Sequence, residues 1–461
     1  MNTEADADRL YHREWRKELP VAVRGEGVYI YDAQGRRFLD AVGGVYVVNV
    51  GHGLQEVVDA MYRQASAIAF PYAGSFTTES ELRLAEEVIE MAPPGFAKAF
   101  FVTGGSEANE VAFKLARKYQ LVKGRPQRWR IVGRWQSYHG ATMATLSAGG
   151  KAGRRTEFLP YMHNFPHVDP PYCYRCPWGK TYPNCGIDCA DAFERVIVQE
   201  DPGSVAGIIC EPITGAASGA VVPPPEYFPR LRETCDRHDL VFIVDEVITG
   251  FARTGRNFAI DHWNVVPDII TCGKGIGSGY APLGAVLIHE RIHDAFLSSA
   301  ESSVYTGYTY SGHPVTCAAG LAVLRYLRRN GLVDKAREDG EWFFAQAERL
   351  LRYPWVGDIR GKGLFMGIEF VADAASRRPF ESAGRFMRQV VDEAWMRQMI
   401  IRGETGTIDG RRGEHIILSP PLVATREEMT RMLDLLEESI VAAAKVLGLS
   451  ADSSVQPAVS P

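Results

Sequence analysis

Short apolar runs alternate with helical patterns from about residue 77 to about residue 323, and this alternation narrows the possible folds more than any other feature. Three of the runs end at residues 102, 245 and 271, and a glycine or an acidic residue follows each of them within two positions. Parallel strands need crossover connections, which are usually helices, so strands and helices must alternate along such a chain. The sequence therefore predicts an α/β fold with a large, mostly parallel sheet.

A lysine and an acid follow two of these runs. Lys274 lies in the glycine-rich segment 272–279 (CGKGIGSG), and Asp245 ends the run 241–245. Open parallel sheets bind ligands at the carboxyl ends of their strands, where we expect both residues to lie. Two interpretations are open for each residue: Lys274 is a Schiff-base nucleophile or a solvated loop residue, and Asp245 meets a ligand or caps the helix that follows. An amine and an acid together suggest pyridoxal phosphate.

The segment 103–110 (TGGSEANE) joins the apolar run 99–102 to a helical pattern. A strand, a glycine turn and a helix start gather unpaired backbone N–H groups and the positive end of the helix dipole, which favour a phosphate. The segment lacks the lysine of a nucleotide-binding P-loop, so the phosphate of a cofactor is the better guest. A serine cap with acidic residues in the first turn explains the same pattern.

Six motifs occur in the order seen in class III pyridoxal-phosphate aminotransferases, and the chain resembles that family from about Gly27 to about Leu436. The motifs are residues 103–110, 138–140, 211–215, 245–255, 273–275 and 307–314. The resemblance implies a fold-type I pyridoxal-phosphate transferase. Such a protein has a large domain with a mostly parallel sheet and a small α+β domain that both termini form.

The resemblance also implies catalytic roles. Lys274 resembles the lysine that holds the cofactor as a Schiff base and then moves a proton between substrate and cofactor carbons. Asp245 resembles the acid that keeps the pyridinium nitrogen protonated, so that the ring acts as an electron sink. Tyr138 resembles the aromatic residue that stacks on one face of the ring, and Val247 the aliphatic residue that covers the other face.

Further positions match the family's contacts with the cofactor. Gly105 and Ser106 match the phosphate-binding turn, and His139 belongs to the motif of the stacking tyrosine and is assigned to the same cofactor site. Thr309 resembles the threonine that reaches the phosphate of the neighbouring subunit's cofactor. Two composite sites require two subunits, so we expect a homodimer or a dimer of dimers.

The chain, with 461 residues, is long enough for two or more domains. We expect residues 1–70 to form the N-terminal part of the small domain, 71–325 the large cofactor domain, and 326–450 the C-terminal part of the small domain. A cysteine-rich insertion occupies 170–190 within the large domain. The tail, 451–461, is rich in Ser, Pro and Ala and is predicted to be disordered.

Charge and hydropathy exclude several classes of partner. A net charge of −5 offers no electrostatic footprint for nucleic acid, and no apolar segment reaches the ~18 residues of a membrane span. The first residues are acidic and polar, unlike the basic and apolar start of a signal peptide. The expected location is therefore the cytoplasm.

Four of the eight cysteines fall within the insertion with the spacing C-x2-C-x8-C-x3-C: Cys173, Cys176, Cys185 and Cys189. Four thiolates at such spacing favour a structural zinc site, with His163 and His167 as spare ligands. Reduced thiols packed in a surface loop and disulfides are the alternatives, and a cytoplasmic location disfavours disulfides. We assign no metal to the catalytic site.

Substrate choice depends on three further positions. Family members that act on ornithine, acetylornithine or 4-aminobutyrate carry a glutamate where this chain has Ala216, whereas amine:pyruvate transaminases have alanine there. Tyr46 matches an aromatic residue that lines their pocket, although hairpin packing explains it equally well. Arg402 resembles the mobile arginine that binds the acceptor's carboxylate, but the loop after it is longer than in the family and adds Arg411 and Arg412 as candidates.

These observations predict a transaminase of the omega type. It would move an amino group from a primary amine or omega-amino compound to a small 2-oxo acid, most naturally pyruvate, by a ping-pong mechanism. A pyridoxal-phosphate lyase, decarboxylase or aminomutase would use the same cofactor site. A non-enzymatic zinc-binding interaction protein is the remaining alternative.

Overall fold

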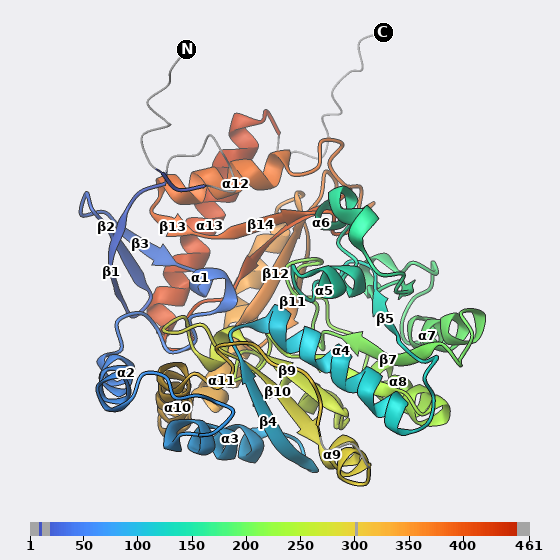
Figure 1. Ribbon diagram of the computed structural model, residues 1–461. Helices are drawn as coiled ribbons and strands as arrows, with labels where there is room; N and C mark the ends of the chain where they lie inside the picture. The colour runs from blue at the N-terminus through green and yellow to red at the C-terminus, as the bar shows by residue number, and fades with distance from the viewer. Residues whose placement is uncertain (1–8, 12–18, 300–302, 450–461) are drawn as a thin grey trace.

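A seven-stranded sheet forms the centre of the protein in the computed structural model, which describes residues 9–11, 19–299 and 303–449. The strand order is β4-β10-β9-β8-β7-β5-β6 (Figure 1). The strands are β4 (Phe96–Val102), β5 (Arg130–Arg134), β6 (His167–Val168), β7 (Val205–Cys210), β8 (Val241–Asp245), β9 (Ile269–Cys272) and β10 (Gly284–His289). Neighbouring strands from β6 to β9 pair in parallel, whereas β10 runs antiparallel to both β9 and β4. The predicted α/β fold is confirmed.

Strand β8 shows how the sheet is buried. Its side chains alternate between two apolar layers, because successive residues of a strand point to opposite faces. Val241 and Ile243 pack in the layer beneath α4 (Gly105–Val122), while Phe242 and Val244 pack in the layer that contains α7 (Asp188–Gln199) and α8 (Tyr227–His238). Helices cover both faces, so the strand is apolar throughout and shows no alternation in its sequence.

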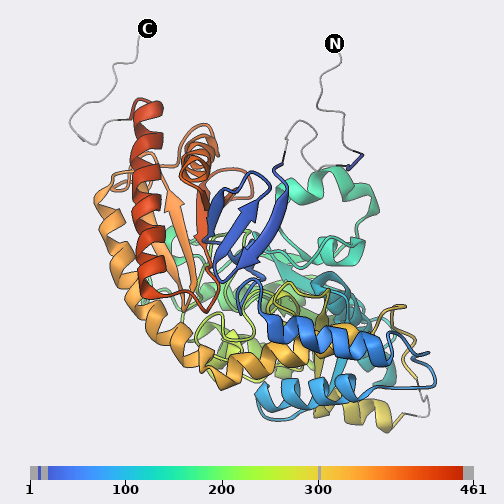
Figure 2. The same ribbon diagram turned by 90° about the vertical axis from the view of Figure 1, so that its left-hand side faces the viewer.

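Two smaller sheets lie beside the central one and share the upper part of Figures 1 and 2. One has the order β1-β2-β3-β13 and the other the order β11-β12-β15-β14. Their strands are β1 (Ala22–Glu26), β2 (Tyr29–Asp32), β3 (Arg37–Asp40), β11 (Val356–Lys362), β12 (Phe365–Phe370), β13 (Met399–Ile400), β14 (Arg402–Thr405) and β15 (Glu414–Leu418). Strand β13 pairs in parallel with β3, so segments from the two ends of the chain share one sheet. The domain boundaries expected at residues 70 and 325 remain predictions.

The remaining helices cover the sheets or connect them. Helix α10 packs against both α2 and α3, and α13 packs against α11 and α12 (Figure 2). They are α1 (Gly43–Tyr46), α2 (Gln55–Ala67), α3 (Glu79–Met91), α5 (Met143–Ala148), α6 (Ala152–Arg155), α9 (Glu290–Leu297), α10 (Pro314–Arg329), α11 (Leu332–Ala347), α12 (Arg385–Met396) and α13 (Arg426–Val446). The tail that the sequence predicts to be disordered lies outside the described residues.

Arg253 joins three distant segments of the chain. It is fully buried, and its guanidinium donates to the carbonyl of Pro420 at 2.6 Å, to Asn49 Oδ1 at 2.6 Å and to the carbonyl of Leu364 at 3.2 Å. Burial lowers the pKa of Arg253 to about 9, while the charge of Asp40 opposes this shift. A buried guanidinium needs such partners, so these contacts fix the two ends of the chain against the central sheet.

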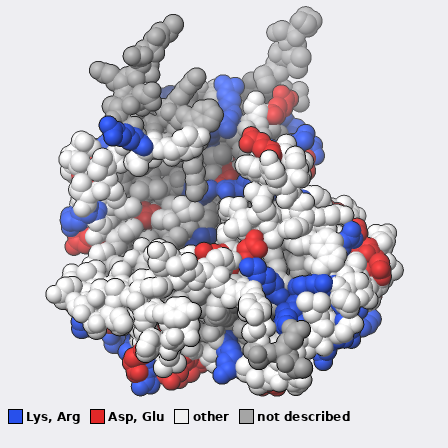
Figure 3. All heavy atoms as spheres, viewed as in Figure 1, with Lys and Arg blue, Asp and Glu red and all other residues white. Residues whose placement is uncertain are grey.

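Among the described residues, no helix combines the length and the apolar character needed to cross a membrane. On the face shown in Figure 3, basic and acidic side chains are interspersed, which agrees with the small net charge of −5.

Candidate active site

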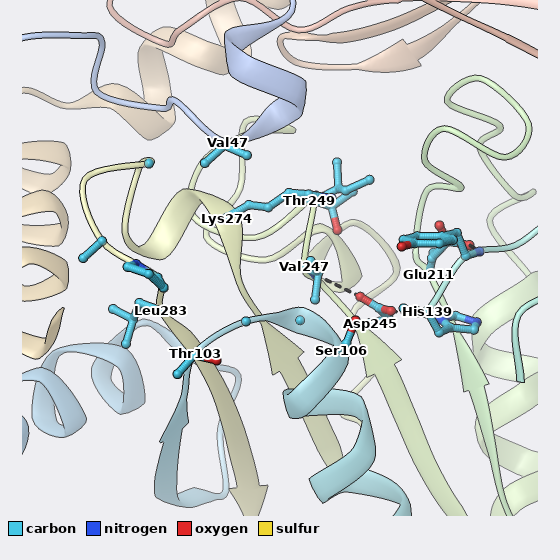
Figure 4. Close-up of a pocket in the computed structure, with 18 of the residues that line it drawn as sticks. Val47, Thr103, Ser106, His139, Glu211, Asp245, Val247, Thr249, Lys274 and Leu283 are labelled. Atoms are coloured by element: carbon cyan, nitrogen blue, oxygen red, sulfur yellow. Dashed lines mark hydrogen bonds and ion pairs between the residues drawn. The ribbon is translucent and has the colours of Figure 1, made fainter. Parts of the chain in front are cut away.

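A cavity of about 460 Å³ opens at the carboxyl ends of β5, β7, β8 and β9, beside the first turn of α4 (Figure 4). Lys274 extends into it from one side, while Asp245, His139 and Glu211 lie on the other. The residues that line it are Val47, Thr103, Gly104, Gly105, Ser106, Tyr138, His139, Gly140, Glu211, Ile213, Asp245, Val247, Ile248, Thr249, Lys274, Gly279, Tyr280, Ala281, Pro282 and Leu283. This edge of a parallel sheet is where a ligand is expected.

Lys274 lies two residues after the end of β9 and has a positive φ of 44°. Its glycine neighbours are required by close contacts: a Cβ on Gly275 would lie 2.4 Å from Asn49 Nδ2, and one on Gly273 would lie 3.2 Å from Val247 Cγ1. Burial lowers the pKa of Lys274 to about 8, although the charge of Asp245 opposes the shift. The amine therefore loses its proton more readily than an exposed lysine, as a nucleophile requires.

Asp245 is held on three sides. Its Oδ2 accepts a hydrogen bond from Asn109 Nδ2 at 2.8 Å and lies 2.8 Å from His139 Nδ1, and its Oδ1 accepts one from the backbone N–H of Val247 at 3.0 Å. Asn109 in turn accepts a hydrogen bond from Thr271 Oγ1 at 2.7 Å. The carboxylate is 4% exposed, so the network fixes a buried negative charge at the floor of the cavity.

The first turn of α4 forms a cradle that tolerates no side chain at Gly105. A Cβ there would lie 2.7 Å from Val247 Cγ1. Ser106 Oγ accepts a hydrogen bond from the backbone N–H of Ala141 at 3.1 Å, which ties the turn to the loop after Tyr138. Backbone N–H groups of a first helical turn have no partner within the helix, so this turn suits a phosphate.

The lining fits the shape and charge of pyridoxal phosphate. Tyr138 and Val247 both border the cavity, where an aromatic and an aliphatic side chain suit the two faces of a flat ring. The buried acid of Asp245 suits the ring's cationic nitrogen, and the cradle of Gly105 suits the phosphate. The amine of Lys274 is of the kind that binds the cofactor's aldehyde.

Tyr46 and Arg402 lie beside this cavity without lining it. The Nζ atom of Lys274 is 5.8 Å from the centre of the Tyr46 ring, and that ring also packs edge-on against Phe365 at 5.6 Å. Arg402 Nη2 donates to Glu404 Oε1 at 2.5 Å, and the charge of Arg402 contributes to the lowered pKa of Lys274. The structure therefore brings Arg402 near the lysine.

The other two arginines and Thr309 lie elsewhere. Arg411 and Arg412 are exposed, and Arg412 Nε donates to Asp409 Oδ2 at 2.7 Å. Thr309 is also exposed, in the loop before α10, and does not line the cavity of its own chain. Its assignment to the site of a partner subunit stays a prediction.

The four cysteines of the insertion border one small hollow of about 20 Å³. All eight cysteines of the chain are free. Burial, with a smaller electrostatic contribution from Cys173 and Cys185, raises the pKa of Cys189 to about 12. Within the described parts of the chain, no three His, Cys, Asp or Glu side chains are arranged to hold a metal ion. The structure thus adds no geometric support for zinc, which stays a hypothesis.

Asn109, which contacts Asp245, and Glu211, which lines the cavity, received no role from the sequence. Asn109 holds Asp245, and its signal was a polar residue on the helix face that it shares with the apolar residues Ala112, Phe113 and Ala116. Glu211 lines the cavity, and its Oε1 accepts a hydrogen bond from the Gly215 N–H at 3.0 Å. Burial raises the pKa of Glu211, although the neighbouring charge of His139 opposes the shift.

The strand order, together with a loop lysine and a buried acid that line one cavity, defines a fold-type I pyridoxal-phosphate transferase. The profile of the aminotransferase class-III family matches residues 11–440, and the chain belongs to this family. Enzymes of the family depend on pyridoxal phosphate. As a member of the family, the protein is an aminotransferase, with an amine donor and an oxo acid acceptor. Membership disfavours the lyase, decarboxylase, aminomutase and non-enzymatic alternatives.

Named relatives cover nearly the whole chain. The putrescine–pyruvate aminotransferase of Pseudomonas aeruginosa is 34% identical over 422 residues, which cover 91% of this chain and 90% of that protein. The diaminobutyrate–2-oxoglutarate transaminase of Halomonas elongata is 34% identical over 429 residues, with the same two coverages, 91% and 90%. The omega transaminase of Pseudomonas jessenii in complex with PMP has a TM-score of 0.89 and 29% identity, and covers 96% of this chain and 98% of its own.

Proposed function

We propose that Lys274 carries pyridoxal phosphate and that the protein transfers an amino group from a primary amine or omega-amino compound to a small 2-oxo acid, with pyruvate as the preferred acceptor. One observation supports this most strongly. Lys274, whose pKa is lowered to about 8, lines the same cavity as the buried Asp245 and the first turn of α4, which suits a phosphate. The reaction is a ping-pong exchange in which the donor product leaves before the acceptor binds.

The bound cofactor supplies an electron sink, and the chain supplies its position and the proton transfers. Asp245, which Asn109 and His139 hold in place, keeps the ring nitrogen protonated. Lys274 accepts and returns the proton that moves between the substrate carbon and the cofactor.

The remaining residues bind the cofactor without taking part in the chemistry. Tyr138 and Val247 fix the plane of the ring, and the N–H groups of Gly105 and Ser106 bind the phosphate. Thr309 completes the phosphate site of a partner subunit, so the enzyme works as a homodimer or a dimer of dimers.

The choice of acceptor rests on two positions. Arg402 lies near Lys274 and carries a guanidinium that binds a carboxylate bidentately. Ala216 leaves no acidic side chain there to hold this arginine once the acceptor has gone. A relative whose name specifies pyruvate and another whose name specifies 2-oxoglutarate are both 34% identical, so both acceptors belong in the test.

A panel of amines, diamines and omega-amino acids, assayed against pyruvate and 2-oxoglutarate, tests this proposal. We expect product with pyruvate and at least one donor that lacks an alpha-carboxylate. Arg402→Ala should slow the oxo acid half-reaction far more than the amine half-reaction, because a charged hydrogen bond contributes about 1.5–3 kcal/mol. Equal losses in both halves would contradict the role of Arg402, and activity confined to alpha-amino acid donors would contradict the proposed donor class.

A further inference from the structure

Three cations surround one carboxylate beside the candidate active site. Glu404 accepts a hydrogen bond from Lys151 Nζ, another from Arg402 Nη2 at 2.5 Å and a third from Arg154 Nη2 at 3.4 Å. The side chains of Lys151 and Glu404 are 10% and 14% exposed, so the ion pair between them is well shielded from water. Glu404 lies in strand β14, where the structure pairs it with His415 of β15.

The cluster reaches the groups that perform the chemistry. Arg154 lies 4.8 Å from the centre of the Tyr138 ring, which borders the cavity. The charges of Arg402 and Arg154 both act on the pKa of Lys274 and on that of Tyr46. The carboxylate of Glu404 is therefore held where a substrate's carboxylate would meet Arg402.

The pairing of Arg402 with Glu404 is incomplete. Only one nitrogen of the guanidinium reaches Glu404, and Arg402 Nε is buried without a hydrogen-bond partner among the described residues. The hydroxyl of Tyr46, which is 1% exposed, likewise has no partner in the described chain. Buried donors without partners cost free energy, so an added carboxylate beside these two groups would be stabilised.

The charges of the cluster do not balance. Two arginines and a lysine face one glutamate. Burial alone would raise the pKa of Glu404, but the charges and hydrogen bonds of Lys151 and Arg402 outweigh burial and lower this pKa to about 2. Glu404 is thus ionised at any working pH, and the cluster keeps a net positive charge that attracts an anion.

We propose that Glu404 is an internal counter-ion that holds Arg402 while the acceptor is absent and releases it to the acceptor's carboxylate, with Lys151 keeping Glu404 paired during the exchange. This inference rests on the proposed function. Glu404 and Lys151 act through Arg402 and are positioning residues. They would set how strongly the enzyme distinguishes a carboxylate-bearing acceptor from a donor that lacks one.

Glu404→Gln and Lys151→Met test the exchange because they should shift the apparent Kd for pyruvate in opposite directions. In single-turnover measurements on the holoenzyme, Glu404→Gln should lower the apparent Kd for pyruvate by about tenfold, since Arg402 no longer leaves a charged partner. The same variant should weaken binding of a simple primary amine, because the charge of Arg402 stays unpaired. Lys151→Met should raise the apparent Kd for pyruvate. Without Lys151, Arg402 is the closest cation left to Glu404, so Glu404 binds Arg402 more tightly and releases it less readily to the acceptor.

Competitive inhibition by propionate gives a second readout that involves no turnover of the inhibitor. The inhibition constant of propionate should fall in Glu404→Gln and rise in Lys151→Met, as the Kd for pyruvate does. Glu427→Gln and Lys445→Met remove the same charges from exposed positions on α13 and should leave every constant unchanged. A Glu404→Gln variant that binds pyruvate and propionate as the parent does, or more weakly, would overturn the inference. Failure of the parent enzyme to transfer any amino group to pyruvate would instead overturn the proposed function.

Discussion

Asn109 Nδ2 donates a hydrogen bond to Asp245 Oδ2 at 2.8 Å and so joins the first turns of α4 to the end of β8. The same amide donates to the carbonyl of His139 at 2.7 Å, and its oxygen accepts from Thr271 Oγ1. One buried side chain thus connects the phosphate-type turn, the acid and the strand before Lys274. The position of Asp245 depends on α4 as much as on its own strand.

Asn109→Ala should destabilise the protein and weaken its hold on pyridoxal phosphate. The change leaves a buried carboxylate and a buried hydroxyl short of a partner, at a cost of about 1–3 kcal/mol in the free energy of unfolding. Chemical denaturation and the rate of cofactor loss on dialysis measure the two effects. Asn109→Asp should be worse, because a second carboxylate would face Asp245. Normal cofactor retention in both variants would show that the network does not support Asp245.

The lowered pKa of Lys274 predicts a pH dependence for the cofactor-free protein. Only the neutral amine attacks an aldehyde, so the rate of pyridoxal phosphate capture should rise with pH and level off above about 8. Between pH 8 and 10.5 the unfolded chain holds a proton that the folded chain has lost, so stability relative to Lys274→Met should rise over that range. A capture rate that still climbs steeply above pH 9 would contradict the lowered pKa.

Arg253→Met should be among the most destabilising single changes in the chain. It removes the donors for two backbone carbonyls and for Asn49, all in a fully buried place, and such losses cost about 3–5 kcal/mol. Urea denaturation should show the loss, while Arg412→Met, at an exposed position, should leave the midpoint nearly unchanged. Similar midpoints for both variants would contradict the role of Arg253 as a link between segments.

The sequence predicted the central sheet because strands such as β7, β8 and β9 are almost wholly apolar, and β8 and β9 lead to the chemically distinctive residues Asp245 and Lys274. It predicted that the C-terminal part of the chain pairs with the N-terminal hairpin, but not that β13 is the strand that does so, since a two-residue strand carries no periodic pattern. The contacts of Glu404 with Lys151 and Arg154 were missed because they join residues far apart in the chain. Their charges fit any solvated loop until the fold places them together.

Thr309 provides a test of assembly. If it completes the phosphate site of a partner subunit, Thr309→Ala should raise the Kd for pyridoxal phosphate by about tenfold, the effect of one lost charge-assisted hydrogen bond. Dilution should release cofactor together with the dissociation of the dimer, because a ligand that binds only the dimer stabilises it. Analytical ultracentrifugation with absorbance detection measures both, and a fully loaded monomer would contradict the composite site.

The central claim is that Lys274 carries the cofactor, and reductive trapping tests it most directly. The holoenzyme is treated with borohydride and digested, and its peptides are mapped by mass spectrometry. The account predicts a pyridoxyl phosphate adduct on Lys274 alone, with no adduct in Lys274→Ala although that variant keeps its fold. An adduct on another lysine in the parent enzyme, or a Lys274→Ala variant that still transfers amino groups near the parental rate, would contradict it.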